Sequence, residues 1–235
     1  MSKLKGQKAQ QQTKEEKLPM TNLMVKLKIK KLLHDAILNE SFENIPKEYL
    51  KAKYFFYLDE YGYNIVQRAA NKRKLSCIPK ELLTEELLVG KTSKSSGFHI
   101  AALEGDLEQI PKEFLTHKNL SIKDEYSTNV YQVALTNGYI KSIPQKLLTP
   151  EVILEKNSEG LNLLEMLEDQ MNWASAVEKK RILADAQFLI RKLPTKTLKE
   201  ISKAVSSRIA FDKELKYELH IRKSIESLKE EQVPI

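Results

Sequence analysis

The sequence is poor in cysteine, glycine and histidine. Cys77 is the single cysteine among 235 residues, glycine occurs seven times and histidine four times. One cysteine excludes an internal disulfide bond and suits a reducing compartment. The sparse glycines form no phosphate-cradling run, and no His or Cys spacing suits zinc. We therefore expect neither a disulfide framework nor a cofactor or metal site.

Long hydrophobic runs are also missing. No run of about 18 apolar residues occurs, so no transmembrane helix is expected. The segment from Met1 to Lys8 lacks the apolar stretch of a secretory signal. With 41% hydrophobic residues, the chain can still bury a sizeable core in one elongated domain. These features predict a cytoplasmic location.

What the sequence does contain is an internal repeat. The segment Ile45–Leu50 (Ile-Pro-Lys-Glu-Tyr-Leu) returns at 78–83, at 110–115 and, more loosely, at 143–148. Its prolines are 33, 32 and 33 residues apart. A fixed period of this length is typical of supersecondary units that stack in tandem, each unable to bury its apolar face alone.

Each repeat is predicted to form two helices. An alanine stands ten residues before each proline, with an apolar residue three positions before the alanine and another four before the proline. This spacing predicts one face of a short helix, on which alanine lets neighbouring helices approach closely. The alanines are Ala36, Ala69, Ala101 and Ala134, and the apolar residues are Leu33, Val66, Phe98 and Tyr131 with Phe42, Leu75, Leu107 and Ile140.

The Ile-Pro dipeptide is predicted to open the second helix, with proline at a first helical position. Thr84, Thr116 and Thr149 follow shortly after, and each is predicted to be a new cap, so we expect this outer helix to be broken. Turn sequences separate the repeats at 59–64, 124–129 and 157–162, and each ends in an Asn that can cap the next helix.

Three features together resemble the ankyrin repeat family over roughly residues 31–170. They are the period, the segment Gly62–Ala70, and Phe98–Ala102 followed by Glu104-Gly105-Asp106. The Thr-Pro-Leu-His tetrapeptide of that family survives only in altered form, as Ser96-Gly97-Phe98-His99, Asn64-Ile65-Val66-Gln67 and Asn129-Val130-Tyr131-Gln132. The resemblance implies an all-α, helix-pair repeat solenoid, with an N-capping helix and four to five repeats across residues 20–170.

Charge is concentrated at the N-terminal end. Residues 1–31 hold nine lysines against Glu15 and Glu16, so their net charge of +7 equals that of the whole chain, and the remainder is balanced. Residues 1–19 are predicted to be a disordered basic tail. After about residue 20, apolar and polar residues alternate as in a strand, but their spacing also fits a helix. We favour a helix that covers the apolar end of the stack. The lysines are Lys3, Lys5, Lys8, Lys14, Lys17, Lys26, Lys28, Lys30 and Lys31.

The repeat ends before residue 171, and residues 171–235 are predicted to form further helices that cap the last repeat. An interaction helix that docks on a partner is the alternative. Pro194 separates two of these helices, and Thr195 or Thr197, with Glu200, resembles a capping box. We expect Trp173 to lie in the core against Leu163, Leu164 and Leu167, Asp212 to cap the last helix, and Leu215, Leu219, Ile225 and Leu228 to form its apolar face.

No catalytic constellation is evident. His34 and His99 share a repeat position with Gln67 and Gln132, so a polar side chain that bonds nearby loop backbone explains them better than a general base. Cys77 stands where other repeats have Asn, Gln or Ser, which argues against a nucleophile. We expect a protein that is not an enzyme.

The preferred function is a protein-interaction scaffold, either an adaptor or an inhibitor, that acts as a monomer. The alternative is nucleic-acid or anionic-surface binding through the lysine-rich N-terminal segment. The resemblance implies a concave surface of loop tips and first helices. Its expected partner-binding residues are Tyr61, Tyr63, Arg68, Lys72, Lys94, Tyr126 and Asn137.

Overall fold

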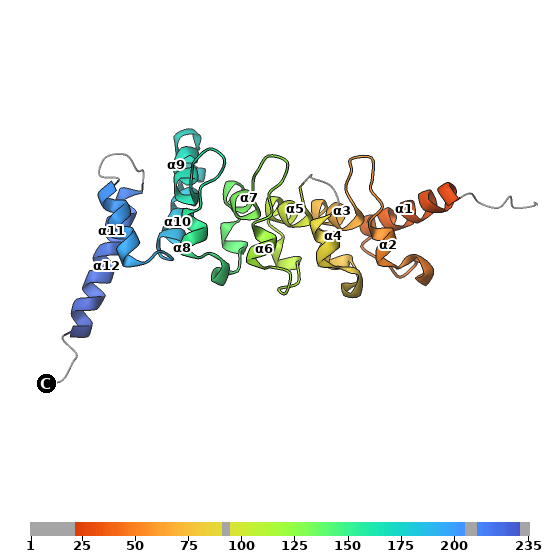
Figure 1. The fold of residues 1–235 in the computed structure, drawn as a ribbon, viewed down its shortest axis with the longest axis horizontal. Helices are drawn as coiled ribbons and strands as arrows, with labels where there is room; N and C mark the ends of the chain where they lie inside the picture. Colours follow the sequence, from red (N-terminus) through yellow and green to blue (C-terminus); the bar gives the residue numbers. More distant parts are fainter. Residues whose placement is uncertain (1–21, 91–94, 205–210, 231–235) are drawn as a thin grey trace, which may run out of the picture.

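The computed structural model describes residues 22–90, 95–204 and 211–230. These residues form twelve α-helices and six short 3-10 turns. The described part contains no β-strand, only an isolated bridge between Lys123 and Asn129. The all-α prediction is confirmed. The helices follow one another along an elongated row in the order of the sequence (Figure 1).

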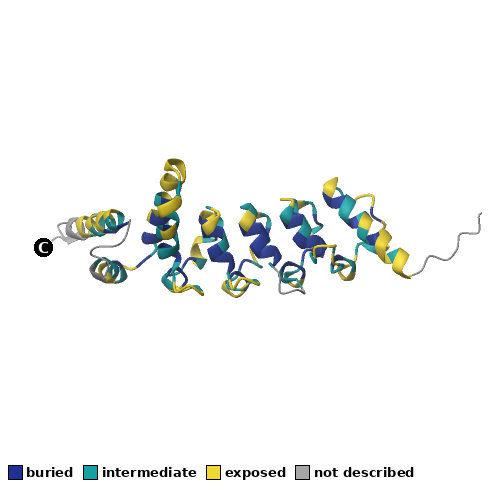
Figure 2. Ribbon diagram, turned by 90° about the horizontal axis from the view of Figure 1, so that it is seen from above, coloured by how far each residue is buried: buried dark blue, intermediate teal, exposed yellow. Residues whose placement is uncertain are grey.

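The first helix of each repeat stands beside its equivalent in the next. α3 packs on α5, α5 on α7 and α7 on α9, while α1 packs on α3 (Figure 2). Ala69, Ala101 and Ala134 are fully buried on these faces, as the alanine spacing predicted. The bounds are α1 (Asn22–Leu38), α3 (Ile65–Asn71), α5 (Gly97–Glu104), α7 (Val130–Thr136) and α9 (Leu163–Trp173).

The second half of each repeat is a chain of short turns and helices. In the second repeat, Thr84 caps the short helix α4 by accepting a hydrogen bond from the amide of Leu87. Thr116 and Thr149 cap α6 and α8 in the same way, so the broken outer helix is confirmed. The bounds are α2 (Ala52–Phe55), α4 (Glu85–Val89), α6 (His117–Leu120) and α8 (Pro150–Leu154), with 3-10 turns at Lys47–Tyr49, Leu75–Cys77, Lys80–Leu82, Leu107–Gln109, Ile140–Ser142 and Gln145–Leu147.

The Ile-Pro dipeptide does not open an α-helix, and that prediction is wrong. Ile78 and Pro79 are both extended, with ψ of 129° and 128°, and they form a corner between two 3-10 turns. The residue before a proline is disfavoured in the α region, which keeps Ile78 extended. Ile143 and Pro144 adopt the same conformation, with ψ of 130° and 125°.

The apolar positions of the repeat build one continuous core. The residue three before each alanine and the residue four before each proline are buried in all four repeats, as predicted. At the first of these positions the fourth repeat has Tyr131, whose hydroxyl lies 3.1 Å from Nδ1 of His117. Burial raises the pKa of Tyr131 to about 12, so its hydroxyl stays protonated.

The N-terminal helix expected in place of a strand is α1. The buried residues of α1 cover the N-terminal end of the core. They are Ile29, Leu33, Ala36 and Ile37. The first two turns of α1 extend past the stack (Figure 1). The predicted disordered tail, residues 1–19, lies outside the described residues.

Three more helices follow α9 in the described part of the chain. Ser175 and Glu178 form a capping box at the start of α10, and Ile182, Ala186 and Leu189 are buried on one face of this helix. α10 packs on α9, and α12 packs on both α10 and α11. No helix in the described ranges is long and apolar enough to cross a membrane. The bounds are α10 (Ala176–Ile190), α11 (Thr195–Ala204) and α12 (Asp212–Glu230).

Three details of this region were predicted wrongly. Trp173 is 88% exposed, because it follows the buried Leu167 by six residues and so points away from the core at 3.6 residues per turn. Thr197 lies inside α11, which already begins at Thr195. Ile225 is exposed because the second half of α12 extends beyond the helices on which its first half packs (Figure 1).

Candidate functional site

Loops between the repeats project as fingers to one side of the row, and side chains within them fix their shape. We call residues 57–63, 122–128 and 155–161 the first, third and fourth finger loops. In the third, Oδ1 of Asp124 accepts from the amides of Tyr126 and Thr128, both at 3.0 Å. Asp59 and Asn157 make the same two bonds in the other fingers, at 2.8 to 2.9 Å. The tips are therefore held by local hydrogen bonds.

The first helix behind each finger begins with a reciprocal cap. Asn64, Ser96, Asn129 and Asn162 each accept from an amide in the first turn, and the third helical residue bonds back to the amide of the cap. The returning side chains are Gln67, His99, Gln132 and Glu165. These capping boxes satisfy amides that would otherwise lack a partner. The Asn caps were predicted from the sequence.

Two of these side chains also reach the next repeat. Nε2 of Gln67 donates to the carbonyl oxygen of Ser95 at 2.9 Å, and Nε2 of His99 lies 2.9 Å from that of Thr128. Because the amide of Ser96 donates to Nδ1 of His99, the ring proton is on Nε2. Burial lowers the pKa of His99 below its ordinary value of 6.5, although the Thr128 carbonyl acts in the opposite direction. His99 is therefore a neutral structural residue, as expected.

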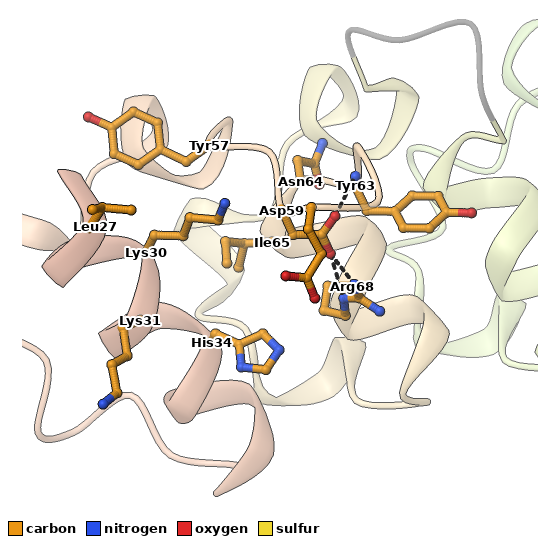
Figure 3. Close-up of a pocket in the computed structure, with 11 residues that line it drawn as sticks. Leu27, Lys30, Lys31, His34, Tyr57, Asp59, Tyr63, Asn64, Ile65 and Arg68 are labelled. Atoms are coloured by element: carbon orange, nitrogen blue, oxygen red, sulfur yellow. Dashed lines mark hydrogen bonds and ion pairs between the residues drawn. The ribbon is translucent and has the colours of Figure 1, made fainter. Parts of the chain in front are cut away.

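His34 occupies the same repeat position as His99 but has different surroundings. α1 begins twelve residues before it, so no cap amide is available there. His34 instead lines a cavity of about 270 Å³ between α1 and the first finger. Figure 3 shows Lys30 and His34 projecting from α1 toward Asp59 and Arg68. The prediction that His34 bonds loop backbone is not met, because the first repeat has no capping turn.

A larger groove of about 520 Å³ runs between the third and fourth finger loops and helices α5, α7 and α9. Helices of three consecutive repeats supply four apolar lining residues, which we call the floor, and polar side chains such as Gln132 and Thr136 lie beside them. Tyr63, Tyr126 and the fourth finger form its rim. The floor residues are Ile100, Leu103, Val133 and Met166.

The charges in this groove have one sign. Among the described residues that line it, Asp124 and Glu159 carry carboxylates and none carries a lysine or arginine side chain. His99 forms part of the lining but is neutral, because its lowered pKa disfavours the charged ring. The groove therefore combines an apolar floor with an acidic, aromatic rim.

Only some of the predicted partner-binding residues line the groove. Tyr63, Tyr126 and Asn137 line the groove, and Tyr126 is 74% exposed. Tyr61 is 58% exposed but lies on the first finger outside it, and Lys72 is exposed at the end of α3. Lys94 lies outside the described residues, as do Lys3, Lys5, Lys8, Lys14 and Lys17 of the basic tail.

Arg68 is engaged within its own repeat. Its Nε donates to Oδ2 of Asp59 at 2.8 Å, and its Nη2 pairs with the same oxygen. The guanidinium also lies 5.1 Å from the ring centroid of Tyr61 and 5.8 Å from that of Tyr63. Arg68 thus fixes the first finger and its two tyrosines through an ion pair and cation–π contacts.

The floor of the groove was largely missed from the sequence. Arg68, Ile100, Val133 and Met166 each directly precede the alanine position, at spacings of 32, 33 and 33 residues. Aligning that column would have shown three apolar residues beside one arginine. In the sequence these apolar residues look like part of the core, because each stands beside the alanine position whose face packs against neighbouring helices.

Metal-ligating side chains do not cluster in the described residues, and the thiol of Cys77 is disfavoured as a thiolate. No group of three or more His, Cys, Asp or Glu side chains in the described ranges lies close enough to hold a metal ion. Burial, followed by the nearby charge of Glu40, raises the pKa of the Cys77 thiol. A raised pKa disfavours the thiolate, which is the reactive form.

A scan against models of known protein families matched none of them, and a search of curated proteins found no match.

Proposed function

We propose that this protein is a non-enzymatic scaffold that binds another protein in the groove between its finger loops and first helices. The observation that carries the proposal is the apolar floor of Ile100, Leu103, Val133 and Met166, which three repeats build together. Its volume of about 520 Å³ lies within the range of about 300–1,000 Å³ that is usual for binding pockets.

The groove favours a partner segment of particular chemistry. An apolar side chain would fill the floor beside Leu103, and tyrosines 63 and 126 would supply contact area with a polar end. The carboxylates of Asp124 and Glu159 would attract a basic residue next to that anchor. We therefore infer a basic segment with at least one large apolar side chain as the preferred ligand.

The same arrangement supports membership of a divergent ankyrin-like solenoid with four to five repeats. The helix pairs, the 33-residue period and the finger loops agree with the resemblance noted in the sequence. The side chains of Gln67 and His99, which bond the next finger, occupy the position of the histidine in the family tetrapeptide. We also propose that the protein acts as a monomer in the cytoplasm. Its single, half-buried cysteine suits that reducing compartment.

Peptide selection on the whole protein tests this function. Peptides from a random display library would be selected on the immobilised chain, and their affinities measured by isothermal titration calorimetry. Leu103→Lys places a cation on the groove floor and should weaken the selected peptides by at least about tenfold. Leu38→Lys is the matched control, because Leu38 and Leu103 are both 47% exposed and only Leu103 lines the groove.

The two outcomes separate clearly. Selected peptides rich in Lys or Arg and large apolar residues, which lose affinity only in Leu103→Lys, would support the groove. Peptides that bind both variants as tightly as the unmodified protein would show that binding occurs elsewhere.

A further inference from the structure

The first two turns of α1 expose apolar side chains at the end of the row. Leu23 is 64% exposed, and Met24 and Leu27 are each 55% exposed. Figure 2 shows this exposed end of α1 projecting beyond the buried part of the helix. The helix was expected to cover the end of the stack, yet its beginning carries an apolar surface of its own.

The exposed leucines and the buried residues of α1 lie on different sides of the helix. Leu23 and Leu27 are four residues apart and share one side of the helix. The residues that enter the core, Ile29, Leu33 and Ala36, lie on the other side. Lysines border the exposed leucines on both sides, because Lys26 and Lys30 flank one edge of the strip and Lys28 and Lys31 the other.

Positive charge is concentrated at the same end. Residues 1–31 carry a net charge of +7, and the remaining residues are balanced. The partner of this end should therefore be anionic. Two copies of the chain joined through this surface would bring both charge clusters together, and like charges oppose such an interface.

We propose that the N-terminal end of α1 docks on an anionic lipid bilayer. The side chains of Leu23, Met24 and Leu27 enter the boundary between head groups and acyl chains, and the exposed Lys28 and Lys31 contact the lipid phosphates and carboxylates. This is the arrangement by which amphipathic helices lie in a membrane interface, where apolar burial and attraction to anionic lipid add together. Nucleic acid offers phosphates but no apolar phase for the leucines, so the exposed strip favours the bilayer.

Membrane docking and the groove use separate surfaces. The residues that line the groove come from the first finger and from α3 to α9, and none belongs to α1. A chain held by α1 at a bilayer therefore keeps the groove free for a protein partner.

Co-sedimentation with vesicles tests the proposal on the full chain. The probes are phosphatidylcholine vesicles with and without phosphatidylserine, and duplex DNA serves as a second polyanion. Leu23→Ser with Leu27→Ser should weaken partition into the anionic vesicles by at least about tenfold. Lys28→Gln with Lys31→Gln should weaken it about 30-fold, because each lysine near an anionic surface contributes about 1 kcal/mol.

Each pair has a matched control far from α1, at the end of α9 and the start of α10. Trp173→Ser with Val177→Ser removes two exposed apolar side chains, and Lys179→Gln with Lys180→Gln removes two exposed charges. Both controls should bind anionic vesicles as tightly as the unmodified protein. Circular dichroism and thermal unfolding establish that every variant is folded.

The proposal is supported if vesicle binding needs phosphatidylserine and weakens with salt. Binding should also fall in both the leucine variant and the lysine variant of α1. Three results would overturn it: unchanged vesicle binding by the leucine pair, an equal loss in the controls, or tighter binding to duplex DNA than to anionic vesicles.

Discussion

His99 joins its own repeat to the next through Thr128. Nε2 of His99 lies 2.9 Å from the carbonyl oxygen of Thr128, while its Nδ1 accepts from the amide of Ser96. Gln67 makes the equivalent pair of bonds one repeat earlier. An amide and an imidazole thus serve the same purpose, but only the imidazole can take up a proton near neutral pH.

Replacing His99 by Gln should therefore remove a component of the pH dependence of stability. The pKa of His99 is lower in the folded than in the unfolded chain, so the unfolded chain binds more protons at mildly acidic pH. The stability linked to His99 is complete above pH about 6.5 and is lost as the pH falls through its folded pKa. Urea unfolding, measured between pH about 8 and about 5, should show this loss of stability in the unsubstituted protein but not in His99→Gln. Parallel curves for both proteins would contradict it.

Substitution of Ala134 by Leu should overpack the interface between α7 and its neighbours. Ala134 is fully buried, and added methylenes in a packed core cost about 1–3 kcal/mol. Thr136→Leu is the control, because Thr136 is exposed two residues later on the same helix. Chemical unfolding measures both, and equal losses would contradict the alanine alignment of the repeats.

Removing the side chain of Asp124 should loosen the third finger. Asp124→Ala deletes the acceptor for the amides of Tyr126 and Thr128, at a cost of about 1 kcal/mol. Asp124→Asn should preserve the loop, because Asn157 makes the same bonds in the fourth finger. Amide hydrogen exchange at residues 126 and 128 distinguishes the variants, and equal exchange in the two would count against this account.

The two exposed tyrosines should contribute unequally to peptide binding. Tyr126 lines the groove, whereas Tyr61 lies outside it beside Arg68. Titration of the selected peptides should therefore show a loss of at least about 1 kcal/mol for Tyr126→Ala and almost none for Tyr61→Ala. A larger loss for Tyr61→Ala would move the binding surface to the first finger.

Local rules made much of this fold predictable. The alanine faces, the Asn caps and the threonine caps at Thr84, Thr116 and Thr149 depend on residues within one or two turns, so the sequence displays them directly. The end of a packed region depends on neighbouring helices instead. Ile225 lies where α12 extends past its neighbours, and Trp173 faces away from the core at the end of α9.

The candidate site was only partly predictable for a related reason. Tyr63, Tyr126 and Asn137 were found because finger tips and exposed helix positions repeat with the period. Ile100, Val133 and Met166 were not, because an apolar residue beside a core alanine looks like another core residue. Only the spacing of the fingers around them leaves a groove above their side chains.

The bonds from Gln67 and His99 all run in one direction along the chain, since each donor precedes its acceptor by 28 or 29 residues. During synthesis the donor side chain therefore leaves the ribosome nearly one full repeat before the carbonyl that it needs. The side chains of Gln67 and His99 can therefore make these bonds only after the finger of the next repeat has been synthesised. In a chain that folds as it is made, each of these two repeats is thus completed by the one that follows it.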